Sequence, residues 1–313
     1  MGMDAAARLA KTVIALCSGI AIEPLTHKPG CVSRFRDVAD KKLLHFYLCS
    51  ATCSSLGLVK GLEIASRGLV DGDVGEIVDA LAARMSAVGS NVCLGSSILL
   101  APLIAAEALN AVEGIEIDAR RLCSRASLVV RERCGPRDTL SILRAIARVM
   151  PSYVHREPPC RAPSVLELDR LREVPRLWSV IEACRGVDTV FDTIFRGYRP
   201  CLEALSFLRS RLETHREWDR AVLDTFLFIC AKVLDQTLVR RVGREFAERV
   251  SEMCREALEA SERGSMDRVE RLLEALDLDL LQRRVSPGSL ADLCAVTISL
   301  YLYETCSELS PSR

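Results

Sequence analysis

Four short segments of the chain carry polar and charged side chains beside glycine or proline, which a buried helical core does not need. They cover residues 27–40, 89–95, 234–243 and 286–292. Lysine and arginine beside free backbone N–H groups suit phosphate, while aspartate suits a hard cation such as Mg²⁺. The residue types therefore favour a site for a phosphorylated ligand, although each segment alone is also typical of a solvated turn or a helix cap.

The first segment places Lys28 next to a Pro-Gly turn that ends at Gly30. Arg34, Asp37 and Asp40 follow in the same predicted loop. The ammonium and the exposed amides of the turn predict a phosphate cradle, and the two carboxylates predict ligands for a cation. A charged, solvated loop is the alternative that these residues leave open.

The second and fourth segments each lead into an apolar run that is typical of a helix. Asn91 and Gly95 lie at the start of one run, where free N–H groups can receive an anion. Ser286 and Gly288 belong to a turn before the last predicted helix, and Asp292 lies in the first turn of that helix. Ordinary helix caps account for the same residue types.

The third segment gathers Asp235, Arg240 and Arg241 at the end of a strongly apolar run. Arginine grips phosphate oxygens in a bidentate manner. An aspartate that follows an apolar helix is expected to be held rigidly and partly desolvated. The segment therefore predicts a phosphate site with an adjacent carboxylate, and a solvated helix end is its alternative.

In order and spacing, the four segments resemble the motif set of the triphosphoribosyl-dephospho-CoA synthases over most of the chain. Members carry a Lys-Pro-Gly motif after the first helix, an Asn-Thr-rich motif that ends in Gly, an Asp-Thr motif with Arg and Gly, and a Pro-Gly motif followed by Ala-Asp. The matching residues here are Lys28-Pro29-Gly30, Asn91 to Gly95, Asp235 to Gly243, and Ser286 to Asp292. The stretch Arg185 to Thr189 looks like a further segment of archaeal members.

The resemblance implies a transferase that joins a dephospho-CoA-like acceptor to the ribose of ATP, with loss of adenine. It implies ATP and Mg²⁺ as ligands, and a carboxylate near the developing oxocarbenium carbon. The residues expected to bind the nucleotide or its phosphates are Lys28, Gly30, Arg34, Asn91, Gly95, Arg240, Arg241, Ser286 and Gly288. Asp235 and Asp40 are expected to be catalytic, and Asp37, Asp40 and Asp292 to hold the metal. The four segments are therefore expected to meet at one cleft.

Four positions in two of these motifs depart from the family pattern. Archaeal relatives tend to have Asn-Val-His after Lys-Pro-Gly, where this chain has Cys31, Val32 and Ser33. They tend to have Asn-Thr-Asn where this chain has Asn91, Val92 and Cys93. The loss of these hydrogen-bonding groups leaves a non-catalytic helical nucleotide-binding or regulatory protein as the alternative function. A helical prenyl-transfer enzyme is set aside, because the sequence contains no Asp-Asp-x-x-Asp stretch.

Apolar residues recur with helical spacing along nearly the whole chain, and strictly alternating runs are missing. The sequence therefore predicts an all-α protein with a single multi-helix domain over residues 1–313. About twelve helices are expected, over residues 4–20, 41–62, 73–88, 92–111, 118–134, 137–150, 172–184, 187–212, 217–234, 243–263, 265–276 and 289–306. Residues 151–163 contain four prolines and are expected to form a surface loop or a linker.

Lys plus Arg and Asp plus Glu number 42 each, so no net field draws the chain to nucleic acid or to an acidic membrane. The apolar run 13–22 resembles a signal peptide, but no small-residue cleavage site follows it, so we expect an ordinary helix. The apolar run 92–112 is long enough to span a membrane, but its polar residues favour a buried core helix. The expected partners are a nucleotide and a CoA-like small molecule in the cytoplasm, and the sequence leaves open whether the chain forms a homodimer.

Several of the 14 cysteines, Cys184 among them, lie in apolar helical runs, where cysteine behaves as a small buried hydrophobe. The sequence also leaves open whether one or two disulfides form.

Overall fold

The computed structural model describes residues 2–89, 92–151 and 160–306. Within these ranges the chain forms α-helices and no named strand, so the predicted all-α class is confirmed. The helices are α1 (Met3–Ile22), α2 (Leu43–Arg67), α3 (Asp73–Ala87), α4 (Leu94–Glu113), α5 (Ala119–Glu132), α6 (Pro136–Val149), α7 (Leu177–Ala183), α8 (Thr189–Phe195), α9 (Arg199–His215), α10 (Trp218–Lys232), α11 (Gln236–Val242), α12 (Arg244–Glu262), α13 (Met266–Gln282) and α14 (Gly288–Thr305). Short 3₁₀ turns lie at Glu23–Leu25 and Leu168–Arg170.

The predicted helices differ from the observed ones most clearly in two places. The single helix expected over residues 187–212 is divided into α8 and α9, because the backbone turns at Gly197 and Tyr198, with φ angles of 64° and 60°. The stretch expected to link two helices at residues 234–243 contains a further short helix, α11, which begins after Asp235. The apolar periodicity reveals neither the turn at Gly197 and Tyr198 nor the short helix α11.

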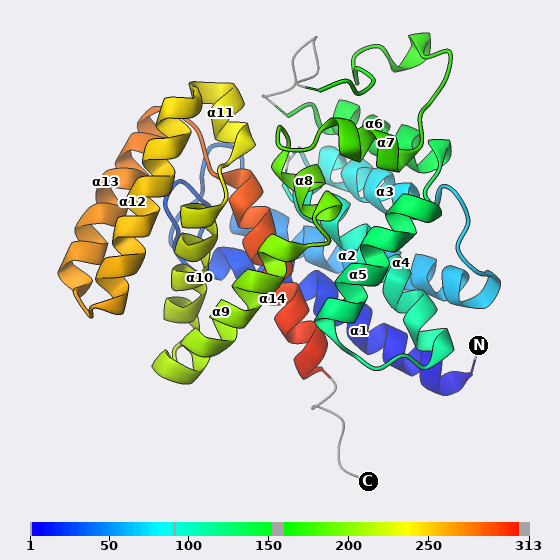
Figure 1. Ribbon diagram of the computed structural model, residues 1–313, viewed down its shortest axis with the longest axis horizontal. Helices are drawn as coiled ribbons and strands as arrows, with labels where there is room; N and C mark the ends of the chain where they lie inside the picture. Colours follow the sequence, from blue (N-terminus) through cyan, green and yellow to red (C-terminus); the bar gives the residue numbers. More distant parts are fainter. Residues whose placement is uncertain (1, 90–91, 152–159, 307–313) are drawn as a thin grey trace.

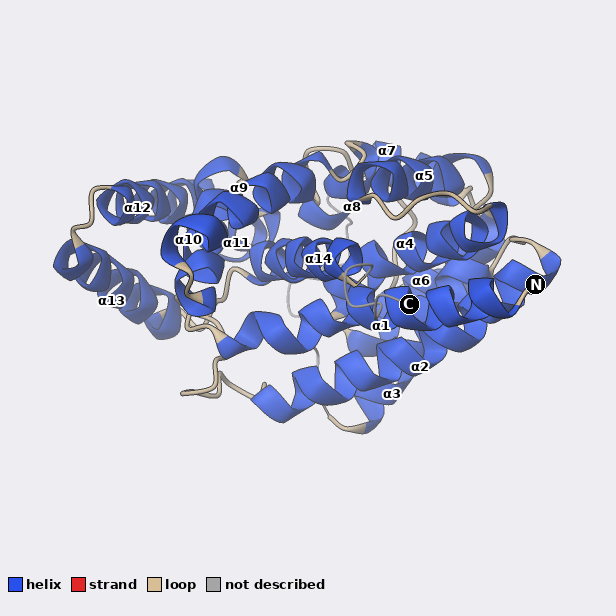
Figure 2. Cartoon of the chain, turned by 90° about the horizontal axis from the view of Figure 1, so that it is seen from below, coloured by secondary structure: helices blue, strands red, loops and turns tan. Residues whose placement is uncertain are grey.

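Helices α4 and α14 occupy the centre of the fold (Figures 1 and 2). Helix α4 packs against α1, α2, α3 and α5, while α14 packs against α1, α9, α10 and α4. Both helices are apolar on nearly every face, which suits a helix that is surrounded by protein. The helical pair α12 and α13 lies at one edge of the molecule (Figure 1).

Two helical segments, Met3–Leu25 and Leu94–Glu113, have the length and composition of a membrane span. In the fold, 83% of the apolar window of the second segment is buried, against 44% of the first. A core helix of a soluble protein passes the same composition test. Helix α4 is thereby the core helix that the sequence predicted.

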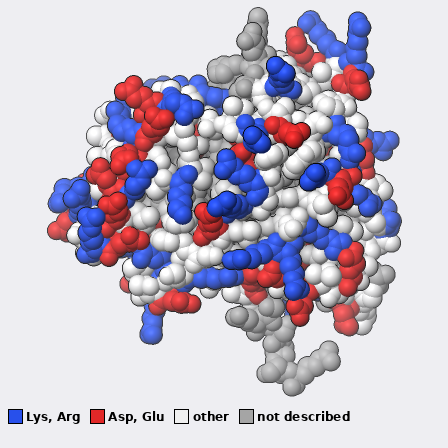
Figure 3. Space-filling model, viewed as in Figure 1, with Lys and Arg blue, Asp and Glu red and all other residues white. Residues whose placement is uncertain are grey.

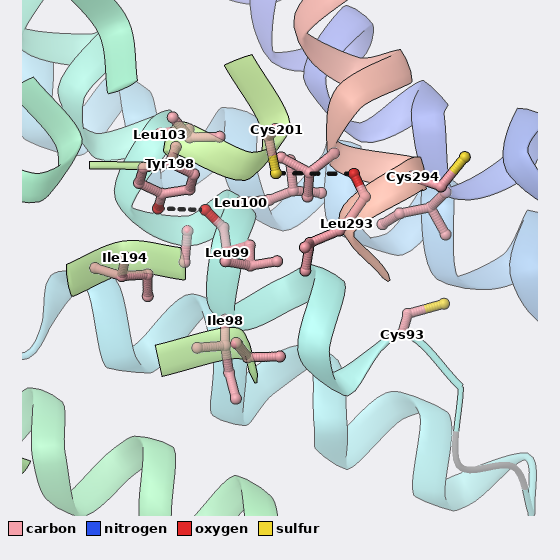
Figure 4. Packing of buried hydrophobic residues seen from close by; sticks show 14 of the residues in the cluster. Cys93, Ile98, Leu99, Leu100, Leu103, Ile194, Tyr198, Cys201, Leu293 and Cys294 are labelled. Atoms are coloured by element: carbon pink, nitrogen blue, oxygen red, sulfur yellow. Dashed lines mark hydrogen bonds between the residues drawn. The ribbon is translucent and has the colours of Figure 1, made fainter. Parts of the chain in front are cut away.

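Tyr198 and Cys201, at the start of α9, contact the two central helices α4 and α14 (Figure 4). The Tyr198 hydroxyl donates to the Leu99 carbonyl at 2.8 Å, in the turn of α4 that precedes Pro102. The Cys201 thiol lies 3.8 Å from the Leu293 carbonyl of α14.

Most of the cysteines are buried among apolar side chains, as predicted. Cys184 is the exception, because it forms a disulfide with Cys160, and the two Cα atoms lie 5.0 Å apart. The interpretation of Cys184 as a free buried thiol is therefore wrong. Its partner lies 24 residues earlier, in a loop that carries no helical periodicity, so the sequence held no signal for this pairing.

Lysine and arginine alternate with aspartate and glutamate over the face shown in Figure 3, without a broad area of one sign. This distribution agrees with the equal numbers of acidic and basic residues. Recognition of an anion must therefore come from a few charges at one place.

Candidate active site

One pocket brings the four sequence segments together. It encloses about 200 Å³, and its walls include Gly30, Gly95, Arg241 and Asp292, one residue from each segment. The convergence that the sequence predicted is therefore confirmed. The apolar part of the lining includes Ile20 of α1 and residues of α2, α6 and α8.

The start of α4 forms one wall of the pocket, and it is capped by a side chain from α14. Asp292 Oδ1 accepts hydrogen bonds from the Ser96 backbone N–H, at 2.9 Å, and from the Ser96 hydroxyl. A Cβ atom on Gly95 would lie 2.1 Å from Asp292 Oδ2. Position 95 must therefore be glycine for the Asp292 carboxylate to reach α4.

Asp292 has the electrostatics of a group that exchanges a proton near neutral pH. Burial raises its pKa to about 7, and the hydrogen bonds from Ser96 and the charge of Lys41 offset only part of that effect. The Glu23 carboxylate acts in the same direction as burial. A carboxyl group with such a pKa can act as a general base at physiological pH.

Asp235 is 2% exposed and is not among the pocket-lining residues. Its Oδ1 accepts the backbone N–H groups of Thr237, at 2.7 Å, and Leu238, at 3.0 Å, which makes it the N-cap of α11. Burial raises the pKa of Asp235 to about 6, although these hydrogen bonds and Arg240 lower it. Asp235 holds the backbone of Thr237, and the Thr237 hydroxyl lies 2.8 Å from the Ser289 hydroxyl. Thr237 and Ser289 both line the pocket.

The ammonium of Lys28 is fully buried and is not part of the pocket wall. It donates to the carbonyls of Glu23, at 2.6 Å, and Thr26, at 2.7 Å, and lies 3.1 Å from Glu23 Oε1. Burial opposes its charge, yet the Glu23 carboxylate raises the pKa of Lys28 above its ordinary value. Two of its three N–H donors are therefore bound to carbonyls, and the Glu23 carboxylate lies beside the ammonium as an ion pair.

The loop between Gly30 and α2 is anchored to α13 through Asp277. The Gly30 N–H and Arg36 Nη2 both donate to Asp277 Oδ1 at 2.7 Å. Burial would raise the pKa of Asp277, but Arg36 and the Gly30 amide hold it below its ordinary value. The anchored loop runs beside the pocket, and its residue Lys41 lines the pocket wall. Lys41 does not belong to any of the four motifs.

The remaining predicted binding residues are divided between the pocket and its surroundings. Arg241, Ser286 and Gly288 line the pocket. Arg34 instead pairs with Asp219 of α10, and Arg240 donates to the Val187 carbonyl at 2.7 Å behind the pocket wall. Asn91 lies outside the described residues.

The three aspartates that were predicted to hold a metal do not lie together at one site. Asp37 and Asp40 are exposed and do not line the pocket, whereas Asp292 does. In the ranges 2–89, 92–151 and 160–306, no three His, Cys, Asp or Glu side chains are arranged to hold a metal ion. The residues present therefore do not form a protein cage for Mg²⁺.

Three of the four departures from these family motifs, Cys31, Val92 and Cys93, lie in the pocket wall. Cys93 has a φ angle of 65°, a left-handed conformation that asparagine tolerates better. Ser33 lies outside the wall, with its Oγ accepting the Phe35 N–H at 3.3 Å. The departures thus make one wall more apolar without altering the rest of the site.

Comparison with known proteins agrees with this fold. The model of the ATP:dephospho-CoA triphosphoribosyl transferase family matches residues 12–310. A crystal structure of the proposed triphosphoribosyl-dephospho-CoA synthase of Archaeoglobus fulgidus superposes with a TM-score of 0.61 at 22% identity, and the match covers 82% of this chain and 98% of that one. A search of curated proteins found no match. Because the family model spans nearly the whole chain, the protein belongs to the ATP:dephospho-CoA triphosphoribosyl transferase family.

Proposed function

We propose that the pocket between α4, α11 and α14 is where the family reaction takes place in this chain. In that reaction the ribose of ATP is joined to dephospho-CoA. The observation that supports the pocket is Asp292, a carboxylate with a pKa of about 7 at the point where the motif segments meet. Asp292 takes the reactive role that the sequence had favoured for Asp235.

Asp292 accepts the proton of the attacking acceptor hydroxyl in this proposal. A bond forms between the hydroxyl oxygen and the ribose carbon, and the bond from that carbon to adenine breaks. Adenine leaves with the electron pair and takes a proton from solvent, while Asp292 returns its proton to solvent. The ribose carbon gains positive charge as adenine departs, and a nearby carboxylate lowers the free energy of that state.

The pocket volume limits what can lie inside it. Pockets that enclose a drug-sized ligand measure roughly 300 to 1,000 Å³, and this one encloses about 200 Å³. We therefore place the ribose inside and the triphosphate and the acceptor at the mouth. Mg²⁺ enters as part of the substrate Mg·ATP, because phosphates and water can fill most of its coordination positions.

The test is release of adenine from ATP by the purified chain, followed by chromatography, with and without dephospho-CoA. We expect adenine and the joined product in equal amounts, and no adenine when the acceptor is omitted. The apolar wall at Val92 and Cys93 favours a second candidate, a nucleotide-binding protein that has lost the reaction. ATP binding without adenine release under any condition would establish that candidate instead.

A further inference from the structure

The charged residues around the pocket differ in whether their charge is already balanced. The lining contains the charged residues Glu23, Lys41, Asp188, Arg241 and Asp292. Glu23 is balanced by Lys28, and Asp188 lies 3.5 Å from Arg240. Arg241 donates from Nη2 to the Arg284 carbonyl at 2.8 Å. Because the Arg284 carbonyl is neutral, this hydrogen bond does not balance the Arg241 charge, and among the described residues neither Arg241 nor Lys41 has an ion pair partner. Both positive charges at the pocket are therefore available to a ligand.

Lys28 cannot meet a phosphate without a large rearrangement. Its ammonium donates to the carbonyls of Glu23 and Thr26, its charge is paired with the Glu23 carboxylate, and the whole side chain is buried. Removing the ammonium from these contacts would leave the buried Glu23 carboxylate without its partner, and such an unpaired buried charge is strongly destabilising. The motif lysine is therefore a structural residue of the turn, and the positive charge for phosphate must come from another side chain.

The backbone of Lys41 is fixed at the pocket. Its N–H donates to the Val38 carbonyl at 3.0 Å, and its carbonyl accepts the Val38 N–H at 3.1 Å. The turn between them requires a left-handed residue at Ala39, whose φ angle is 53°. Asp277 anchors the same loop through Arg36. A flexible lysine side chain thus extends from a rigid base beside Asp292, whose pKa its charge lowers.

We infer that Lys41 binds the triphosphate of ATP in this chain, in the role that the motif assigned to Lys28. The inference rests on the proposed function, because it takes the ribose to lie beside Asp292. An ammonium is a compact point charge with rotatable donors, which suits a phosphate chain that enters at the mouth of a pocket. A charge-assisted hydrogen bond of this kind changes affinity by about 10- to 100-fold.

The experiment compares Lys41→Gln with Lys42→Gln by calorimetry. The neighbouring Lys42 is exposed, does not line the pocket and carries the same charge, so it is a matched control. Mg·ATP and adenosine are the two probes. We expect Lys41→Gln to weaken ATP binding by about 10- to 100-fold and to leave adenosine binding unchanged, while Lys42→Gln changes neither by more than about twofold. Lys41→Arg should retain most of the ATP affinity.

The outcomes separate this inference from the proposed function. Equal ATP affinities of the Lys41→Gln and Lys42→Gln variants would overturn the role of Lys41, while adenine release by the wild type would still support the reaction. Loss of adenosine binding together with ATP binding in Lys41→Gln would also overturn it, because that result indicates a damaged pocket. A wild-type chain that neither binds ATP nor releases adenine would remove both proposals.

Discussion

Two helices that begin at the pocket, α4 and α11, have aspartate caps of different origin. Asp235 caps α11 from the adjacent position in the chain, whereas Asp292 caps α4 from 196 residues away. The local cap is withdrawn from the pocket wall, and the distant cap is part of it. A carboxylate that joins two separate helices lies where their surfaces meet, and such junctions are where pockets form. The comparison therefore favours a structural role for Asp235 and agrees with the proposal that Asp292 is the reactive carboxylate.

The largest expected effect is on turnover in a pair of matched variants. Asp292→Asn removes the charge and the basic oxygen, so kcat should fall by about two orders of magnitude or more. Asp235→Asn keeps an amide oxygen that caps a helix nearly as well, and its kcat should stay within a few-fold of wild type. Adenine release measured at saturating ATP and acceptor gives both values. The reverse order would return the reactive role to Asp235.

Gly95→Ala tests whether the contact between α4 and α14 positions Asp292. The new Cβ would lie 2.1 Å from Asp292 Oδ2, so the carboxylate must move. A displacement of about 1 Å at a reacting group can lower the rate by about 100-fold. The control is Gly61→Ala in α2, where the added Cβ meets only the Leu9 side chain, at 3.2 Å. Wild-type kcat in Gly95→Ala would show that the position of Asp292 does not matter.

The third effect is on pH dependence. The reaction requires ionised Asp292, so kcat should rise about tenfold per pH unit below its pKa and level off above about pH 7. The free energy of unfolding changes with pH in the opposite direction to the rate. The pKa of Asp292 in the folded chain lies above its ordinary value of 3.8, so its contribution to stability is present at low pH and is lost as the pH rises toward 7. Rate profiles and thermal melts of wild type and Asp292→Asn isolate this group from Asp235 and Asp138, whose pKa values are raised to about 6. A wild-type rate profile without this rise would contradict a proton-accepting Asp292.

The smallest expected effect is the loss of a helix cap. Asp235→Ala should lower the free energy of unfolding by about 0.5–2 kcal/mol and Tm by a few degrees. Asp118→Ala is the control, because Asp118 caps α5 away from the pocket by accepting the Arg121 N–H at 2.7 Å. Thermal melts should show similar losses in both variants. A rise in KM only in Asp235→Ala would show that the cap also positions Thr237.

Periodicity in the sequence was sufficient for the fold class and for most helices, since the apolar spacing of α1 to α6 and of α12 is regular. The motifs also placed their segments at one pocket. What they did not reveal was the direction of individual side chains. From its motif, Lys28 was predicted to bind phosphate, but in the fold its ammonium is paired with Glu23, five residues earlier. Lys41 belongs to no motif, and only the turn from Val38 places it at the pocket wall.

The anchoring of the first loop by α13 also bears on the order of folding. Gly30 and Arg36 are held by Asp277, across 247 and 241 positions of sequence, and Arg34 pairs with Asp219 across 185. Contacts of such high contact order form slowly, because a long chain segment must be closed first. During synthesis, the first helices emerge long before α13 exists to receive the loop. The pocket is therefore completed late in folding, when the helical pair α12 and α13 docks.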